Sequence, residues 1–336
     1  MRAGEQMIRV GVVGLGAVGQ KRVASALNDP RSRLTWVADI DEALATAVAA
    51  RSGCRYTADW RDLIAADDVD AVAVATYHKW LSPIAAAALR SGKHVLCEKP
   101  CGRGLSETQA IESAARDTGL VAKAGFTLRF HPAIVSAHQI HTSASLGRPL
   151  LLRAVYGHGG RMGYDREWRA DGELAGGGEL LDQGIHLIDL ARWFLGDIET
   201  ASGLATRLYW DGGLEDNAFV LATMAGDAIA SLHASWTEWK NKFCLELFTA
   251  EGFIRVDGLG GSYGEEKLTV GRRLALGSAP DEKVESFPEP DVCWTDDWSD
   301  FLDSIESKRP PKASICDAVE AMRAIDCVYR GQKRFQ

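Results

Sequence analysis

The feature that most constrains this chain is a glycine-rich turn near its beginning. The apolar, β-branched run MIRVGVV (7–13) is followed by GLGAVG (14–19) and then by QKRVASAL (20–27), which reads as a helix. A strand, a G-x-G-x-x-G turn and a helix in this order are the fingerprint of a dinucleotide-binding unit. The spacing therefore predicts that a nucleotide pyrophosphate lies against the turn and the helix N-terminus.

Each glycine of the turn has its own expected task. Gly14 permits the tight turn, Gly16 lets the backbone approach the pyrophosphate, and Gly19 lets helix and strand pack closely. Ala17 and Val18, which lie between the last two glycines, are expected to contact the cofactor as well.

The next apolar run predicts which dinucleotide binds. LTWVADID (34–41) reads as a second strand that ends at Asp39 and Ile40. A carboxylate at this position can accept both hydroxyls of the adenosine ribose, and it repels the extra phosphate of NADP. No arginine follows it, so NAD is favoured over NADP. The alternative is that Asp39 only caps the next helix, a task that Asp41 could perform instead.

Strands and helices continue to alternate up to residue 126, which predicts an α/β fold with a doubly wound parallel sheet. The expected strands are VDAVAVAT (69–76), HVLCEKP (94–100) and VAKAGF (121–126), separated by helices over 81–92 and 106–119. Ligands bind beyond the carboxyl ends of such strands. The side chains expected at that edge are Thr76, Tyr77, His78, Leu81, Glu98 and Lys99.

The pattern changes after residue 126, which predicts two domains, 1–126 and 127–336. Short strands, among them TRLYW (206–210), follow one another up to residue 258, and helices are expected over 294–308 and 314–331. We expect an α+β substrate-binding and oligomerisation domain with a mostly antiparallel sheet, and an active site between the domains. The closing helix could pack back on the first domain.

The segment GGGELLDQGIHLIDLARWFLG (176–196) carries the second set of reactive side chains. Its glycines predict a mobile loop that leads into a helix, and Asp182 and His186 lie four residues apart on one helical face. A carboxylate can orient a histidine and raise its basicity. Asp189 is also one turn from His186 and could compete for this role. Two residues four apart could bind zinc, but further ligands are not apparent, so no metal is expected.

Three motifs coincide in this chain: GLGAVG, the strand-ending EKP (98–100) and GGGELLDQGIH. Together they resemble the glucose–fructose oxidoreductase/inositol dehydrogenase family (Gfo/Idh/MocA). The resemblance covers nearly the whole chain and implies a Rossmann domain, a second domain with an open, largely antiparallel sheet, and hydride transfer at a sugar or polyol carbon. It also implies self-association, as a homodimer or homotetramer.

The resemblance also implies roles for single residues. Lys99, Asp182 and His186 correspond to the catalytic residues, Glu98 to an acid that helps hold the nicotinamide ribose, and Trp168 with Arg169 to a pair near the nicotinamide. The family segment T-P-N-x-x-H is replaced here by the residues from Thr76 to Leu81. Backbone contacts to the cofactor can survive this change, because they need no particular side chain.

Polar and aromatic residues of the second domain are candidates for a sugar pocket. Aromatic faces stack on the C–H surfaces of sugars, and charged groups bind hydroxyls or a phosphate. The substrate-binding residues expected are Lys99, Tyr156, His158, Arg161, Arg169, Asp182, His186 and Trp236, with Glu238, Trp239 and Lys240 as further candidates.

The expected activity is NAD-dependent oxidation of a hydroxyl, or reduction of the ketone, in a sugar or polyol that can be phosphorylated or nucleotide-linked. Lys99 or His186 takes the hydroxyl proton, with Asp182 holding the geometry. Two alternatives stay open: tightly held NAD used transiently for hydrolysis, elimination or epimerisation, and a non-catalytic sensor of NAD or sugar.

Composition limits the partners. The 38 basic and 46 acidic residues give a net charge of −8, which argues against nucleic-acid partners and anionic membranes. No apolar run is long enough for a membrane span, and the first residues lack the apolar core of a signal peptide. We therefore expect a cytoplasmic protein.

Overall fold

The computed structural model describes residues 7–274, 278–288 and 292–331, and the chain divides into two compact units. The first unit holds the residues up to Phe126 together with Trp294–Val319, and the second holds Thr127–Cys293 together with the residues from Glu320 onward. The chain therefore returns to the first unit near its end, which a single boundary after residue 126 does not describe. None of the described helices is both long and apolar enough to cross a membrane.

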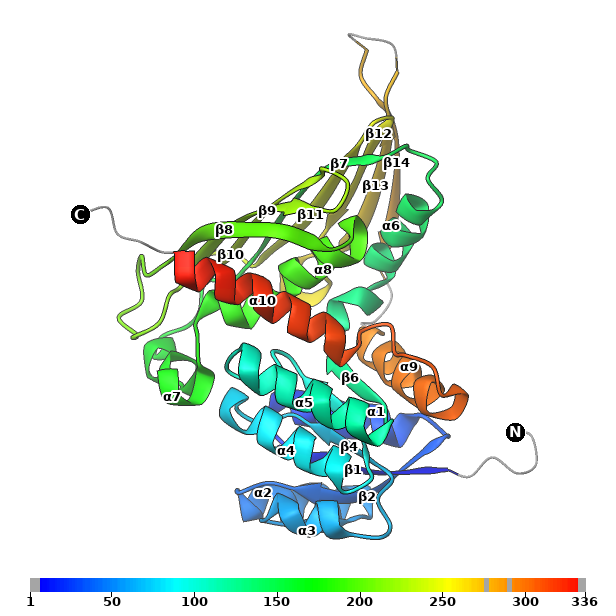
Figure 1. The fold of residues 1–336 in the computed structure, drawn as a ribbon, viewed down its shortest axis with the longest axis vertical. Helices are drawn as coiled ribbons and strands as arrows, with labels where there is room; N and C mark the ends of the chain where they lie inside the picture. The colour runs from blue at the N-terminus through cyan, green and yellow to red at the C-terminus, as the bar shows by residue number, and fades with distance from the viewer. Residues whose placement is uncertain (1–6, 275–277, 289–291, 332–336) are drawn as a thin grey trace. The chain divides into compact units, whose positions relative to one another are not determined.

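The first unit contains a six-stranded sheet in which every neighbouring pair is parallel, in the order β3-β2-β1-β4-β5-β6 (Figure 1). This is the strand order of a dinucleotide-binding Rossmann sheet, as the alternating sequence pattern predicts. The strands are β1 (Ile8–Val13), β2 (Ser32–Ala38), β3 (Arg55–Thr57), β4 (Ala71–Val74), β5 (His94–Glu98) and β6 (Ala122–Gly125). The helices between them are α1 (Ala17–Asn28), α2 (Glu42–Ser52), α3 (Trp60–Ala65), α4 (His78–Arg90) and α5 (Leu105–Thr118).

The core of the first unit explains why a distant helix belongs to it. Strands of a parallel sheet are covered on both faces and read as continuous apolar runs. Val10 and Val12 of β1 are fully buried, and they share one apolar cluster with Trp298 and Phe301. Both aromatic residues belong to α9 (Cys293–Ser307), which is followed by α10 (Ile315–Gly331).

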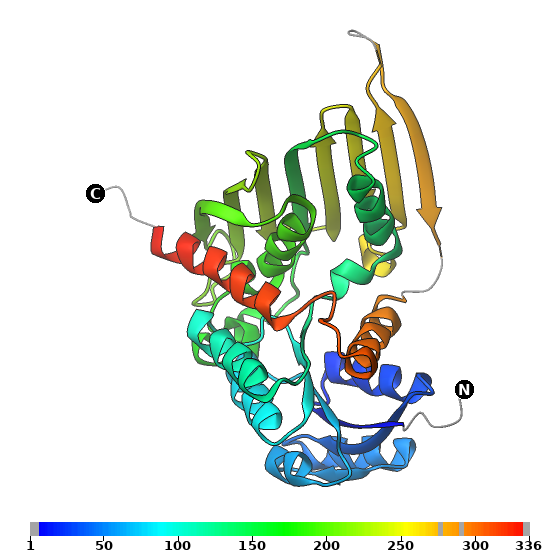
Figure 2. The ribbon, with the colours of Figure 1, turned by 45° about the vertical axis from the view of Figure 1, so that its right-hand side comes forward.

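The second unit contains an eight-stranded sheet in the order β14-β13-β12-β11-β7-β10-β9-β8 (Figure 2). Only the β7–β10 pair is parallel among the pairs of this sheet, so the sheet is mostly antiparallel, as expected. The strands are β7 (Pro149–Gly157), β8 (Ile198–Thr206), β9 (Asn217–Met224), β10 (Ile229–Ser235), β11 (Lys242–Thr249), β12 (Gly252–Asp257), β13 (Glu266–Arg272) and β14 (Asp281–Phe287).

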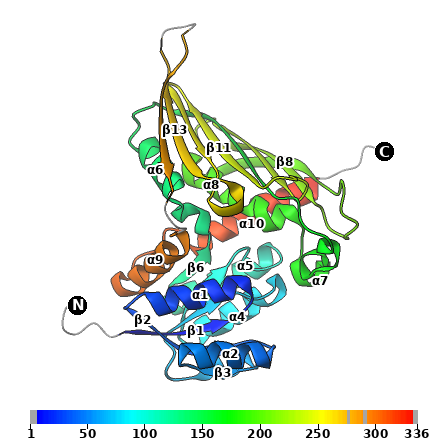
Figure 3. The same ribbon diagram turned by 180° about the vertical axis from the view of Figure 1, so that it is seen from behind.

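One face of this sheet is covered by helices and the other is open (Figures 2 and 3). The covering helices are α6 (Pro132–Thr142) and α8 (Ile185–Leu195), which pack on β12 and β13 and on β7 and β10 respectively. The alternation along β9 follows this division, because Val220 is buried whereas Phe219 and Leu221 are 42% and 55% exposed. Such one-sided burial is typical of antiparallel sheets.

The prediction of a strand at TRLYW (206–210) is wrong. Strand β8 ends at Thr206, and the residues that follow form a loop that lasts until β9 begins at Asn217. The reason is Asp216, whose buried carboxylate accepts the backbone N–H groups of Leu208, Tyr209 and Trp210, each at 2.8 Å. These three donors are therefore bound to a side chain and not to a neighbouring strand.

Candidate active site

The glycine turn has the shape that a bound pyrophosphate requires. Gly14 has a φ of +86°, and a Cβ there would lie 2.5 Å from the carbonyl oxygen of Ala75, so only glycine fits. A Cβ on Gly19 would collide with the carbonyl of Gly14. Gly16, by contrast, faces open space and precedes α1, whose first turn has no side-chain cap and no acidic residue. The N–H groups at this helix end are thus available to an anion.

Asp39 is fixed by the backbone on both of its oxygens. Its Oδ2 accepts the N–H of Leu15 at 2.6 Å, and its Oδ1 accepts the N–H of Asp41 at 2.9 Å. Each carboxylate oxygen can accept a second donor, so both remain suited to ribose hydroxyls. Asp41 caps α2 by accepting from Leu44, which means that Asp39 is not needed as the helix cap. Its neighbour Ile40 is 85% exposed.

The remaining residues predicted to bind the cofactor in the first unit follow the turn or a strand end. Thr76 and Tyr77 come just after β4, and Tyr77 is the residue before the first turn of α4. Tyr77 is 41% exposed, whereas His78 is 4% exposed and Leu81 is fully buried. Ala17 is exposed and Val18 half-buried at the start of α1.

Glu98, which ends β5, is held in a network of buried charges. Its Oε1 accepts from Arg22 at 2.7 Å from Nε and 2.5 Å from a terminal nitrogen, and Arg22 also reaches Asp297 at 2.6 Å. Lys123 joins Asp297 at 3.0 Å to Asp300 at 2.8 Å. We call Arg22, Glu98, Lys123, Asp297 and Asp300 the buried ion chain.

The contacts of Glu98 anchor the backbone next to Lys99. Burial raises the pKa of Glu98, an effect that the charge of Arg22 partly offsets. Lys99 is half-buried, and its peptide bond to Pro100 is cis. The backbone on the N-terminal side of Lys99 is therefore anchored through a carboxylate to α1 and α9. The predicted role of Glu98 at the nicotinamide ribose stays a prediction, since the structure shows this carboxylate engaged with Arg22.

In the second unit, Asp182 lies in a single π-helical turn (Leu180–Gly184) that runs directly into α8. Its carboxylate accepts from Nε of Arg169 at 3.1 Å, and His186 lies in the first turn of α8. Asp182 and His186 are each 6% exposed. A π turn widens the helix by one residue and is frequently found at functional sites.

Several predicted substrate residues surround this pair. The ring of Tyr156 lies edge-on to His186 at 6.0 Å between centroids, and Trp168 lies under the guanidinium of Arg169 at 4.5 Å. His158 and Trp236 contact Tyr164 at 5.7 and 4.9 Å between ring centroids. Arg161 is the outlying member of the set, because its guanidinium pairs with Glu167 and its side chain is 68% exposed.

Asp189 has a different task from the alternative considered for it. Its two carboxylate oxygens accept from the guanidinium of Arg129 at 2.5 and 2.8 Å, and both residues are buried. A bidentate pair of this kind fixes both side chains. Asp189 therefore ties α8 to the short 3₁₀ turn Thr127–Phe130.

The glycine loop before Asp182 is pinned by residues that the sequence did not reveal. Glu215 Oε1 accepts the N–H of Gly178 at 3.0 Å and the hydroxyl of Tyr329 at 2.5 Å. A Cβ on Gly177 would lie 2.5 Å from that hydroxyl, and one on Gly178 would collide with the backbone of Glu215. Glu215 and Tyr329 thus position the start of the segment that carries Asp182 and His186. They lie far apart in the sequence, so no local pattern joins them.

The sequence also provides no indication of three further residues near the site: Tyr164, Gln183 and Tyr263. Tyr263 shares hydrogen bonds with Tyr156 and Gln183, and burial raises the pKa of both tyrosines. Burial and then the charge of Asp182 raise the pKa of Tyr164. The glycines of DGLGGSYG (257–264) indicate a loop around Tyr263 but not its contacts. Among the described residues, no group of three or more His, Cys, Asp or Glu side chains is placed to hold a metal ion.

Comparisons with known proteins agree with this fold and these motifs. Residues 8–126 match the model of an oxidoreductase family with an NAD-binding Rossmann fold, and residues 134–258 match the GFO/IDH/MocA C-terminal domain. Inositol 2-dehydrogenase of Rubrobacter xylanophilus is 28% identical over 284 residues, which cover 82% of this chain and 79% of the relative.

Two further proteins extend the comparison over nearly the whole chain. D-xylose 1-dehydrogenase (NADP(+)) 2 of Haloferax volcanii is 25% identical, with 95% of each chain covered. The crystal structure of GenD2 from gentamicin A biosynthesis, in complex with NAD, is 28% identical with a TM-score of 0.82, covering 97% of this chain and 94% of that one. Since the two family models together span most of the sequence, the chain belongs to the GFO/IDH/MocA family of oxidoreductases.

Proposed function

We propose that the protein is an NAD-dependent oxidoreductase that transfers a hydride between nicotinamide and a hydroxyl or keto carbon of a sugar or polyol. The observation that carries this proposal is the pairing of Asp182 with Arg169 one turn before His186, in a chain whose other unit carries an open glycine turn. The names of relatives, inositol 2-dehydrogenase and D-xylose 1-dehydrogenase, support a polyhydroxylated substrate.

The cofactor would be held by the glycine turn, the N-terminus of α1 and Asp39. The fixed carboxylate of Asp39 favours NAD, because it would repel the 2′-phosphate of NADP. Its two oxygens are already oriented by backbone N–H groups. Replacing Asp39 with Ala should weaken NAD binding and bring the Kd values for NAD and NADP closer together. Equal Kd values for the two cofactors in the unchanged protein, measured by fluorescence titration, would refute the preference.

The protein's own residues would move the proton. When bound, NAD supplies the nicotinamide carbon that accepts the hydride. As the hydride leaves the carbinol carbon, the hydroxyl proton passes to the amine of Lys99 or the imidazole of His186. Asp182 orients the site and stabilises positive charge on the imidazole. Arg169 holds Asp182 in place and, with Tyr156, Trp236, His158 and Arg161, contributes to sugar binding.

Lys99 and His186 are tested best in combination. We expect Lys99→Ala to lower kcat by at least about 10²-fold, the usual contribution of a placed base, while NAD still binds. His186→Ala should lower kcat as well. If both residues act on one substrate, the double variant should lose much less than the product of the two single losses.

Two results would refute this mechanism. Normal turnover in Lys99→Ala would remove this residue from the chemistry, and strictly multiplicative losses would indicate independent roles. Arg323→Ala serves as a control, because Arg323 forms an exposed pair with Glu320 on α10 and is not among the residues proposed to bind substrate, and it should retain kcat.

Self-association is proposed through the open face of the eight-stranded sheet, as a homodimer or homotetramer. This face carries Phe219 and Leu221, which are apolar and exposed in the single chain. Phe219→Glu should lower the molar mass measured by light scattering, whereas an unchanged mass would exclude this face. We also propose that the protein acts in the cytoplasm, which cell fractionation would test.

A further inference from the structure

Two large aromatic side chains of the second unit stand exposed and in contact. Tyr209 and Trp239 pack edge to face, with 4.9 Å between ring centroids, although they are 61% and 67% exposed. They come from different loops, one after β8 and one after β10. Exposed apolar surface of this kind is typical of a site that binds a ligand or another protein.

The loops that carry the pair are fixed by specific contacts. The buried carboxylate of Asp216 accepts the N–H groups of Tyr209 and its two neighbours, and Arg207 donates to the carbonyl of Gly212 at 2.7 Å. A Cβ on Gly159 would lie 3.2 Å from the backbone of Trp239, so the absence of a side chain there makes room for this tryptophan. The pair is therefore prearranged, which lowers the entropy lost when a ligand binds.

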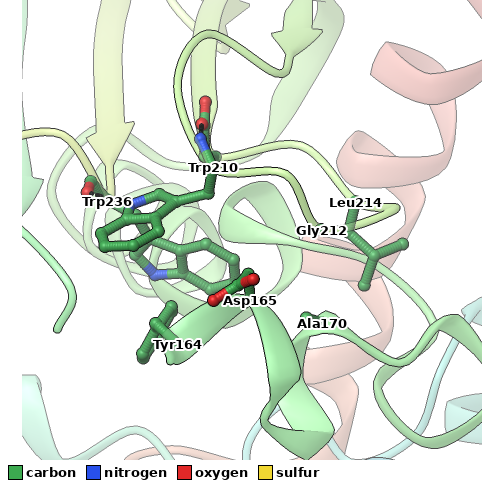
Figure 4. Close-up of a pocket in the computed structure, with 8 residues that line it drawn as sticks. Tyr164, Asp165, Ala170, Trp210, Gly212, Leu214 and Trp236 are labelled. Carbon is green, nitrogen blue, oxygen red and sulfur yellow. Dashed lines mark hydrogen bonds between the residues drawn. The ribbon is translucent and has the colours of Figure 1, made fainter. Parts of the chain in front are cut away.

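A chain of rings connects the pair to the candidate active site. Tyr209 contacts Trp210 at 5.2 Å, and Trp210 contacts Tyr164 at 6.2 Å between centroids. The indole N–H of Trp210 donates to the carbonyl of Trp236 at 3.0 Å, and both tryptophans line a small cavity with Tyr164 (Figure 4). Tyr164 is close enough to Asp182 for that charge to raise its pKa.

This chain of rings fixes the distance between Asp182 and the exposed pair, because all of these residues belong to the second unit. Tyr164 and Trp236 are almost fully buried, so they form a packed base between Asp182 and the exposed pair. A ligand that reaches from Asp182 to Tyr209 and Trp239 would have to be longer than a single sugar ring. An exposed charge borders the pair, since Lys240 follows Trp239 directly.

We propose that Tyr209 and Trp239 form an outer subsite that binds the second sugar unit of a glycoside whose first unit is oxidised beside Asp182 and His186. The inference rests on the proposed function and adds the substrate class to it. One sugar face packs against the two rings through its C–H groups, as apolar surfaces do on aromatic faces. The ammonium group of Lys240 can donate hydrogen bonds to hydroxyls of this sugar.

Binding can be measured without turnover, which separates this proposal from the proposed function. Saturation-transfer NMR on the NAD-loaded protein would compare cellobiose and lactose with glucose and galactose. We expect at least one disaccharide to bind about fivefold to tenfold more tightly than its monosaccharide, a gain typical of one stacked ring. Trp239→Ala and Tyr209→Ala should each remove this preference and leave the affinity for the monosaccharide unchanged.

Tyr56→Ala is the control, because Tyr56 is an exposed aromatic residue, at 43%, that belongs neither to the candidate site nor to the open sheet face. It should keep the preference for the disaccharide. The milder variant Trp239→Gln should also lose the preference while its thermal unfolding midpoint stays unchanged. This result would exclude misfolding as the cause of the loss.

Three results would overturn the proposal: no disaccharide preferred over its monosaccharide, a preference that survives both substitutions, or a fall in molar mass in Trp239→Ala or Tyr209→Ala, which would make the pair an interface between copies. If the preference depends on the pair but no sugar is oxidised, the subsite stands and the proposed hydride transfer fails.

Discussion

Glu98, the neighbour of Lys99, belongs to a buried ion chain, whereas Asp182 lies beside one arginine and several aromatic residues. In the first unit, Arg22 and Lys123 hold three carboxylates away from water. In the second unit, Asp182 forms an ion pair with Arg169 at 3.1 Å. The comparison teaches that the first unit fixes the residue beside Lys99 through several buried charges, whose desolvation must be offset by pairing, whereas the second unit holds Asp182 through its ion pair with Arg169 among packed aromatic rings.

The largest expected effect comes from opening the buried ion chain. Arg22→Met leaves the carboxylates of Glu98 and Asp297 buried without their main partner, so it should lower the free energy of unfolding by about 3–5 kcal/mol. Chemical denaturation measures this loss. Arg61→Met is the control, because Arg61 pairs with Asp59 in the same unit but its side chain is 65% exposed.

The control should lose only about 0–1 kcal/mol, as exposed pairs do. Comparable losses in the two variants would mean that burial of the ion chain is not what distinguishes the first unit.

A smaller loss is expected where the second unit pins its glycine loop. Tyr329→Phe removes the hydroxyl that donates to Glu215, a hydrogen bond to a carboxylate worth about 1.5–3 kcal/mol. Because the loop leads to Asp182, kcat should fall as well, while the Kd for NAD stays the same. Tyr56→Phe, which alters a half-exposed tyrosine of the first unit, provides the control. A Tyr329→Phe variant with normal kcat would show that the loop keeps its position without this anchor.

The aromatic loop should respond to the loss of one charge. Asp216→Asn replaces a carboxylate that accepts three backbone N–H groups, and we expect it to destabilise the loop by about 1–2 kcal/mol. Hydrogen exchange is the direct measurement, since the amides of Leu208, Tyr209 and Trp210 should exchange faster. Unchanged protection of these amides would contradict the explanation given for the missing strand.

The smallest effect is a pH dependence of opposite sign at two adjacent acids. Burial raises the pKa of Glu215 above 4.5, despite the hydrogen bond from Tyr329, so its contribution to stability is present below that value and is lost as the pH rises through the raised pKa. Burial alone would raise the pKa of Asp216, but the N–H groups of its loop lower it below 3.8. Its contribution is therefore present above that value and is lost as the pH falls further.

The two variants separate these titrations. Relative to the unchanged protein, the destabilisation caused by Glu215→Gln should shrink as the pH rises from 4 upward. The destabilisation caused by Asp216→Asn should shrink as the pH falls below 4. Thermal melts across this range provide the measurement, and curves that run parallel to the unchanged protein would disprove both assignments.

Local patterns were sufficient wherever a neighbouring residue determines the structure. The turn at Gly14, the strand end at Asp39 and the alternation of strands and helices follow the local pattern of βαβ units, and the sequence predicts them. The predicted strand TRLYW does not form, because its backbone N–H groups donate to the carboxylate of Asp216, ten residues after Thr206. Tyr329 and Glu215 could not be found, since their contact joins residues more than a hundred positions apart.

The division of the chain has a practical consequence for protein engineering. A chimera that borrows the nucleotide-binding half of a relative by a single crossover after Phe126 would leave Trp298 and Phe301 facing a foreign apolar core. It would also separate Asp297 and Asp300 from their partners Arg22 and Lys123. Recombination would have to transplant Trp294–Val319 together with the first segment to keep these contacts.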